Sequence, residues 1–137
     1  MCVNKNGEYA NEQMMDMLQV KNSICVPYCI RLYNSHEGRD DGVMYYDMEL
    51  RVYLEGNNNY TSYKASKRYS EILKFYKHEK SKYGSLPTFP PKIIFKNEEN
   101  MRERYKGIKT CLFYMSHSVP NPYEDNEFSE FFGLEKL

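Results

Sequence analysis

The chain has 137 residues, of which 28% are charged and 41% hydrophobic, and this length suits one compact domain rather than two. Its 19 basic and 19 acidic residues balance, and no apolar run approaches the roughly 18 residues of a membrane-spanning helix, so a transmembrane protein is not expected. The four cysteines form no CxxC pair, which indicates neither a zinc site nor a disulfide framework and favours reduced thiols in the cytoplasm.

Alternating hydrophobic residues predict that the first secondary structure in the chain is a β-hairpin. Residues 24–32 and 43–54 both alternate with period two, and the glycines and aspartates of residues 34–42 predict the loop between them. Residues 60–67 suit a third strand, because their tyrosines and threonine favour a pleated surface. The three segments together predict an antiparallel β-meander. One face of the second strand carries six apolar or aromatic side chains: Met44, Tyr46, Met48, Leu50, Val52 and Leu54.

The hydrophobic period changes to about 3.6 residues after the third strand, which predicts a helix. Ser70 is its predicted N-cap and Gly84 its predicted end. A second helix is predicted over residues 98–115, and Arg104 borders its apolar stripe, so we expect this side chain to face a groove rather than open water. Phenylalanines within residues 128–134 predict a short terminal helix that closes the core.

Three prolines within residues 86–91 predict a fixed, extended loop between the two main helices, because proline restricts the backbone and lacks an N–H donor. Strands followed by helices, rather than alternating with them, are typical of an α+β domain. The predicted architecture is a three-stranded antiparallel β-meander packed against a helical layer. We assign residues 21–137 to this domain and residues 1–20, rich in Asn, Gln and Glu, to a flexible N-terminal arm.

Charge is distributed unevenly along the chain. Residues 60–109 hold 13 basic and 5 acidic side chains, a net charge of +8, whereas the remaining residues carry a net charge of −8. The asymmetry indicates that the middle of the chain meets an anionic partner, such as a phosphate group, a lipid surface or nucleic acid. A solvated, lysine-rich helix face would give the same count, so charge alone leaves both interpretations open.

Three motifs in this basic region resemble those of the phox-homology (PX) domain family. Residues 67–72, Lys-Arg-Tyr-Ser-Glu-Ile, resemble the family signature Arg-Tyr-Ser-Asp-Phe, with mild changes at the last two positions. Residues 86–92, Leu-Pro-Thr-Phe-Pro-Pro-Lys, are similar to its proline-rich loop ending in lysine. Residues 104–108, Arg-Tyr-Lys-Gly-Ile, are similar to its Arg-Arg-Lys-Gly-Leu helix. The motifs occur in the family's order and spacing, and the likeness covers about residues 21–137.

The resemblance implies a module that binds phosphatidylinositol 3-phosphate (PI3P) and attaches its protein reversibly to endosomal or vacuolar membranes. It assigns the 3-phosphate to Arg68, the inositol ring to Tyr69, the 1-phosphate to Lys92, and the 4- and 5-hydroxyls to Arg104. The planar guanidinium group suits phosphate recognition. Each residue taken singly also has a structural explanation, such as a local ion pair or a place in the core. The prediction that separates the two is that all four side chains line one cleft.

An apolar triplet follows the proline-rich loop. Ile93, Ile94 and Phe95 lie between two lysines and resemble the membrane-inserting loop of the same family. Burial in the protein core is the alternative for these side chains. Insertion into a bilayer would contribute roughly 1.5–3 kcal/mol for each fully buried side chain.

The sequence also bears on functions other than lipid binding. No enzyme and no cofactor are expected, because His36, His78 and His117 have no nucleophile or metal ligand at a recognisable spacing. A single-stranded nucleic-acid-binding domain would use the same basic, Tyr-rich middle segment, but the strand and helix order differs from that of an RNA-recognition sheet. Residues 87–90 also match a PxxP ligand for a partner domain. A protein partner could further bind through other parts of a larger chain.

Overall fold

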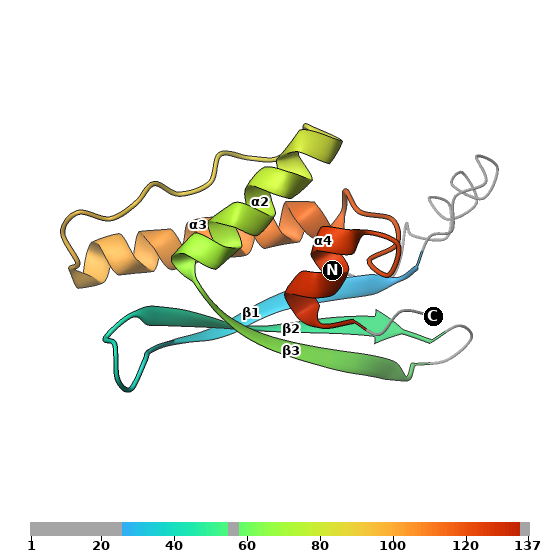
Figure 1. The fold of residues 1–137 in the computed structure, drawn as a ribbon, viewed down its shortest axis with the longest axis horizontal. Helices are drawn as coiled ribbons and strands as arrows, with labels where there is room; N and C mark the ends of the chain where they lie inside the picture. Colours follow the sequence, from blue (N-terminus) through green and yellow to red (C-terminus); the bar gives the residue numbers. More distant parts are fainter. Residues whose placement is uncertain (1–25, 55–57, 135–137) are drawn as a thin grey trace.

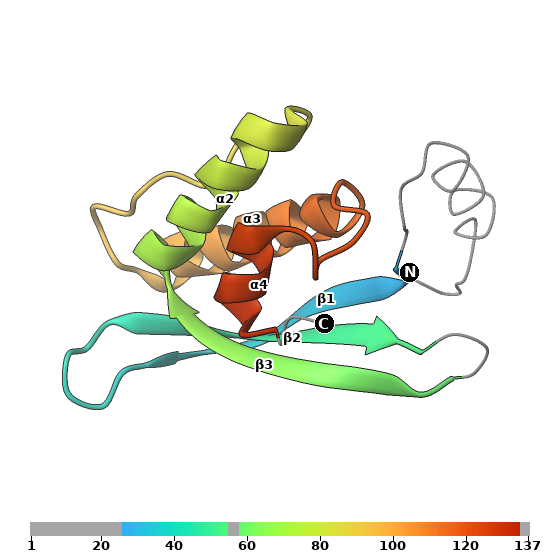
Figure 2. The ribbon, with the colours of Figure 1, turned by 45° about the vertical axis from the view of Figure 1, so that its right-hand side comes forward.

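A computed structural model describes residues 26–54 and 58–134 of the chain. Its elements follow the order β1 (Tyr28–Glu37), β2 (Met44–Tyr53), β3 (Tyr60–Arg68), α2 (Tyr69–Tyr83), α3 (Glu98–Ser116) and α4 (Asn126–Phe132). The strands form one antiparallel sheet in the order β1-β2-β3, and the three helices lie on one face of it (Figures 1 and 2). The predicted α+β meander with a helical layer is therefore confirmed. The predicted N-terminal arm, residues 1–20, lies outside the described residues.

The central strand β2 carries the core alternation that its sequence predicted. Tyr46, Met48, Leu50 and Val52 are all buried, whereas Leu54, just beyond the strand, is about half exposed. These inward side chains pack beneath the helices. The sheet therefore forms the floor of the domain, with its polar face directed away from the helical layer.

The predicted loop over residues 34–42 was too long, because β1 continues to Glu37. A register shift between Leu32 and Asn34 lets the strand continue. Asn34 and His36 both bond the Asp47 carboxylate across the pair, at 2.9 and 3.0 Å. The residue types of this segment favour a loop when they are considered alone. Polar side chains that bond to each other across the open face of a sheet are also compatible with a strand.

The predicted N-cap of α2 was also wrong, since Arg68 occupies that position and Ser70 lies in the first turn. Strand β3 runs directly into the helix, and the Glu71 side chain accepts a hydrogen bond of 3.0 Å from the backbone N–H of Arg68. This carboxylate satisfies the backbone N–H of the observed N-cap residue, which is the reciprocal bond of a capping box. The predicted end is confirmed, because Gly84 terminates α2 with a φ of 77°, in a region that glycine tolerates best.

Helix α3 lies over β1, and the short α4 closes the end of the core. Ile108, Leu112 and Met115 are fully buried along the inner side of α3, as its apolar stripe predicted. The α4 side chain Phe128 packs edge-on against Phe75 of α2, with ring centroids 5.5 Å apart. These contacts join α3 to the sheet and α4 to α2 in one core.

Candidate functional site

A cavity of about 390 Å³ lies between the proline-rich loop and the N-terminal half of α3. Nine residues line it: Pro90, Pro91, Lys92, Ile93, Ile94, Phe95, Asn100, Glu103 and Arg104. Two of the four predicted headgroup residues, Lys92 and Arg104, are therefore in one cleft. All three residues of the predicted insertion loop line the same cleft. Arg104 of α3 thus meets Lys92 and the apolar triplet that follows it at one place.

Arg104 is the most buried of the four predicted headgroup residues, with 8% of its surface exposed. Its Nε donates a hydrogen bond of 2.8 Å to the hydroxyl of Tyr46 on β2. Its guanidinium carbon lies 4.7 Å from the ring centroid of Tyr69, within the range of a cation–π contact. Helical geometry predicted that Arg104 borders the apolar stripe of its helix and faces a groove. The structure agrees, because its guanidinium group lies at the cavity and is held between the sheet and α2.

Tyr69 connects the start of α2 to the proline-rich loop. Its hydroxyl donates to the Pro90 carbonyl at 2.7 Å, and its ring centroid is 5.5 Å from that of Phe89. Burial raises the pKa of Tyr69, while the Arg104 charge acts in the opposite direction. Because Arg104 already stacks on this ring, an inositol ring would share Tyr69 with the guanidinium group.

Arg68 and Tyr69 do not line the cavity, so the prediction that all four side chains line one cleft holds for Lys92 and Arg104 only. Unlike Tyr69, Arg68 has no ring contact or hydrogen bond with Arg104. It lies opposite Tyr45 at the end of β3, and its exposed guanidinium has no hydrogen-bond partner within residues 26–54 and 58–134. The Arg68 charge acts on Asp41 of the β1–β2 turn, whose pKa is lowered first by the Val43 N–H and to a smaller extent by Arg68. Arg68 is therefore an exposed cation without a hydrogen-bond partner among the described residues, outside the cavity that holds Lys92 and Arg104.

The apolar loop is directed into solvent. Ile94 and Phe95 are 86% and 75% exposed, and Ile93 is half-buried, so burial in the core does not describe the first two. The loop is nevertheless tied to the next helix, because Asn100 donates a hydrogen bond of 2.9 Å to the Phe95 carbonyl. The exposed side chains are presented from an anchored backbone.

Two residues at this site were not recognised from the sequence. Tyr46 was assigned only to the core, although a fully buried tyrosine usually needs a partner for its hydroxyl, and that rule was the available signal. Gly107 belonged to a motif without a stated role. A Cβ at Gly107 would lie 2.9 Å from Pro90 Cγ, so its absence lets α3 approach the proline-rich loop closely.

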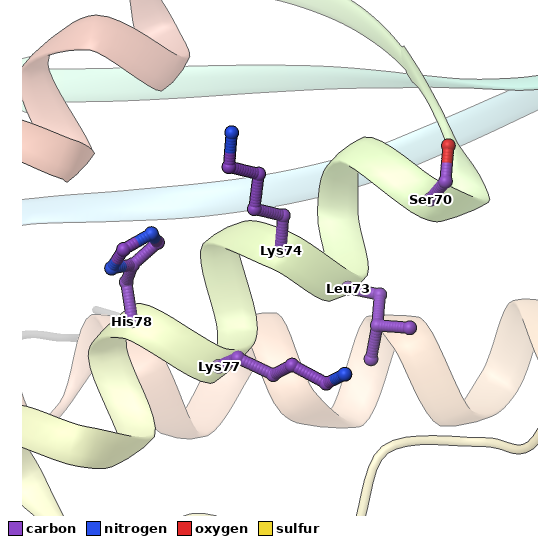
Figure 3. Close-up of a pocket in the computed structure, with 5 residues that line it drawn as sticks. All are labelled: Ser70, Leu73, Lys74, Lys77 and His78. Atoms are coloured by element: carbon purple, nitrogen blue, oxygen red, sulfur yellow. The ribbon is translucent and has the colours of Figure 1, made fainter.

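A second hollow of about 390 Å³ runs along the exposed side of α2. Its lining is Ser70, Leu73, Lys74, Lys77 and His78 (Figure 3). These residues follow one helical face, but the amino groups of Lys74 and Lys77 point in different directions rather than at one point (Figure 3). This is a basic helix face and not a convergent site.

The described part of the chain also bears on metal sites and membrane spans. Across residues 26–54 and 58–134, no group of three or more His, Cys, Asp or Glu side chains could hold a metal ion. In the same residues, no helix is long and apolar enough to cross a membrane.

Comparison with known proteins identifies the family. A family model for the PX domain matches residues 56–135. Human HCLS1-binding protein 3 is 37% identical over 73 residues, a match that covers 50% of this chain and only 18% of that protein. PX domains generally are phosphoinositide-binding modules that attach peripherally to membranes and are not catalytic.

Solved structures give the same fold at low sequence identity. The mouse SNX19 PX domain with a bound sulphate ion superposes with a TM-score of 0.58 at 15% identity, covering 80% of this chain and 99% of that chain. A designed CISK-PX domain gives a TM-score of 0.56 at 18% identity, covering 75% and 96%. With the family model matching more than half of its length, this chain belongs to the PX domain family.

Proposed function

We propose that this PX domain binds PI3P and thereby recruits its protein reversibly to endosomal or vacuolar membranes. One observation carries the proposal: the cavity that contains Lys92 and Arg104 is also lined by the exposed side chains of Ile94 and Phe95. A cationic pocket beside an exposed apolar loop suits a membrane lipid, whose anionic headgroup enters the pocket while the loop enters the bilayer.

Each headgroup residue has a distinct role in this proposal. The free guanidinium of Arg68 binds the 3-phosphate, and Lys92 binds the 1-phosphate, which connects to the diacylglycerol. Tyr69 supports the inositol ring, and Arg104 donates to the 4- and 5-hydroxyls. The exposed, unpaired state of Arg68 supports its role, because a phosphate would not have to displace an existing hydrogen-bond partner.

The same loop geometry weakens the peptide-ligand alternative. Tyr76 and Tyr69 donate hydrogen bonds of 2.6 and 2.7 Å to the carbonyls of Pro87 and Pro90, and Phe89 is buried. A PxxP ligand must present its prolines to an aromatic groove on another domain. Here the domain's own tyrosines hold the carbonyls of this segment, and its last residue, Pro90, lines the cavity.

Sedimentation with liposomes tests the proposal. We expect Arg68→Ala to weaken binding to PI3P liposomes by about 1.5–3 kcal/mol, the scale of a lost charge-assisted hydrogen bond, without changing the melting temperature. Lys77→Ala, which removes an exposed cation from the other side of α2, is the matched control and should bind as the wild type does. Equal binding by Arg68→Ala and the wild type would contradict the assignment.

A panel of phosphoinositides and a single-stranded RNA define the ligand. We expect PI3P to bind most tightly among the lipids and the RNA to give no shift at the same protein concentration. Tighter binding of RNA than of PI3P liposomes would replace the lipid proposal with the nucleic-acid alternative.

A further inference from the structure

The hydroxyl group of Tyr46 joins the sheet to the proposed headgroup site. Tyr46 is 1% exposed on the inward face of β2, and its hydroxyl accepts the hydrogen bond from Arg104 Nε at 2.8 Å. The two residues are 58 positions apart in the chain. A side chain that only filled this volume would need no hydroxyl, so its oxygen points to a function beyond packing.

Arg104 is fixed by that hydroxyl and by two rings. Its guanidinium carbon lies 4.7 Å from the ring centroid of Tyr69 and 5.8 Å from that of Tyr46. Because the guanidinium group is planar and its Nε–H is bonded to Tyr46, the directions of its four remaining N–H bonds are set. The partner is a neutral hydroxyl rather than a carboxylate, so the full positive charge stays available to a ligand.

The remaining donors of Arg104 open into the cavity. Among the described residues, neither terminal nitrogen of Arg104 has a hydrogen-bond partner, and neither is completely buried. The terminal nitrogens of Arg104 therefore retain contact with solvent. Since Arg104 lines the cavity beside Lys92, that contact is made through the cavity.

We propose that Tyr46 is a positioning residue that holds Arg104 in one orientation toward the headgroup and thereby determines which phosphoinositides the cleft accepts. The inference rests on the proposed function and extends it to selectivity. A fixed guanidinium can donate to two neighbouring ring hydroxyls. A phosphate at either ring position requires the guanidinium to move, which breaks the Tyr46 hydrogen bond and the stack on Tyr69.

Binding of soluble, short-chain lipids by Tyr46→Phe in the 137-residue chain tests selectivity. We expect affinity for PI3P to fall about fivefold to tenfold, the effect of losing one positioned hydrogen bond. Affinity for the 3,5-bisphosphate should fall less or rise, so the preference for PI3P over the bisphosphate shrinks. Tyr105→Phe is the matched control. Tyr105 follows Arg104 on α3 but does not line the cavity, and its hydroxyl donates a hydrogen bond of 3.3 Å to the Leu32 carbonyl of β1.

A second arm tests whether Tyr46 acts through Arg104. In a double-mutant cycle with Arg104→Lys, Tyr46→Phe should have little further effect on PI3P affinity, because lysine has no Nε–H for the hydroxyl to hold. An equal loss for both lipids, or additive losses in the cycle, would overturn the inference and leave Tyr46 with a structural role only. So would an equal effect of Tyr105→Phe.

A ligand-free measurement separates this inference from the proposed function. In NMR spectra of the wild type, the Arg104 Nε–H should exchange slowly with water, and in Tyr46→Phe it should exchange at least tenfold faster. Unchanged exchange would overturn the positioning role whatever the lipid results. A wild-type chain that binds no phosphoinositide but shows the exchange difference would overturn the proposed function and the selectivity while confirming that Tyr46 orients Arg104.

Discussion

Each end of helix α2 lies beside a buried titratable side chain, but only one of these two side chains opens to a cavity. At the start of α2, Tyr69 stacks on Arg104, whose cation is held by neutral groups and remains open to a cavity. Toward the end of α2, Glu79 is completely buried, and its carboxyl group meets the Asp125 carboxylate instead of a cavity. The two side chains therefore differ in access: Arg104 opens to a cavity that a ligand could enter, whereas Glu79 is enclosed against another carboxyl group.

At the second of these ends, three acidic side chains surround Lys82: Glu79, Asp125 and Glu127. Burial, and then the neighbouring Asp125 carboxylate, raise the pKa of Glu79 to about 8. Asp125 is itself partnered, by the Phe128 N–H at 3.0 Å and by Lys82 at 3.2 Å, and these partners keep its pKa low although burial acts in the opposite direction. Lys82 also pairs with Glu127. Glu79 is therefore protonated at neutral pH and Asp125 is ionised.

The largest effect that we predict is a loss of stability as the pH rises. The pKa of Glu79 is about 8 in the folded state and about 4.5 in the unfolded state, so between these values the folded state binds the additional proton. The free energy of unfolding should fall by about 1.4 kcal/mol per pH unit across this interval. Below the lower value the contribution is complete, and above the upper value it is lost.

Urea unfolding at pH 5.5, 6.5 and 7.5 measures this slope. Glu79→Gln cannot ionise, so the variant should have a flatter pH dependence and unchanged affinity for PI3P. Glu130→Gln, at an exposed position of α4, controls for the loss of one carboxylate. An identical slope in Glu79→Gln and the wild type would show that Glu79 does not titrate in this range.

At the open end, the next largest effect is expected from Ile94→Asp. Because Ile94 is 86% exposed, the substitution should not change the melting temperature or the affinity for short-chain PI3P. It should weaken binding to PI3P liposomes by roughly 1.5–3 kcal/mol, the value of one apolar side chain removed from water. Phe113→Asp, at an exposed aromatic of α3 outside the cavity lining, is the control. Equal losses for soluble lipid and liposomes would exclude insertion of Ile94.

The smallest effect that we predict comes from Gly107→Ala, which tests the width of the cleft. The added Cβ would lie 2.9 Å from Pro90 Cγ, so α3 or the proline-rich loop must shift. Overpacking of about 1–3 kcal/mol is partly offset by about 1 kcal/mol of helix propensity, so the net stability change should be small. We expect PI3P affinity to fall about threefold, measured by calorimetry, as the positioned groups separate.

Thr110→Ala provides the comparison for this last variant, because it changes helix propensity at an exposed position of the same helix. If Gly107→Ala binds PI3P as tightly as Thr110→Ala does, the close contact with Pro90 serves packing and not the ligand.

Much of the fold was predictable, because strand and helix periods are properties of neighbouring residues. The meander, the end of α2 at Gly84 and the stripe of α3 follow from spacings of two to four residues. The two errors have different causes: a cross-strand contact overrides the local preference for a loop, and a side-chain contact within the first turn moves the start of α2. Asp47 pairs with side chains of the opposite strand and extends β1 into a predicted loop, and Glu71 allows the helix to begin at Tyr69, before the expected cap.

The candidate site was also predictable from the sequence only in part. Motif order in the sequence indicated Arg68, Tyr69, Lys92 and Arg104 as a group. The structure puts Lys92 and Arg104 in one cavity and leaves Arg68 and Tyr69 outside its lining, although the Tyr69 ring contacts the Arg104 guanidinium group. No spacing rule indicated that Tyr46 would hold Arg104. A hydrogen bond across the domain depends on how the helix packs on the sheet, which neither segment encodes alone.

The amino-acid sequence by itself determined the order of strands and helices, the proline-rich loop and the chemical types present at the cleft, because these depend on local geometry and side-chain chemistry. Only the tertiary structure decided which titratable side chains are held by hydrogen-bond partners, which are exposed to solvent and which are enclosed in the core. Arg104 and Glu79 both lie on helices, yet one reaches a cavity and the other is enclosed beside Asp125. Burial and partners, which set the free energy of a charge, are properties of the packed fold.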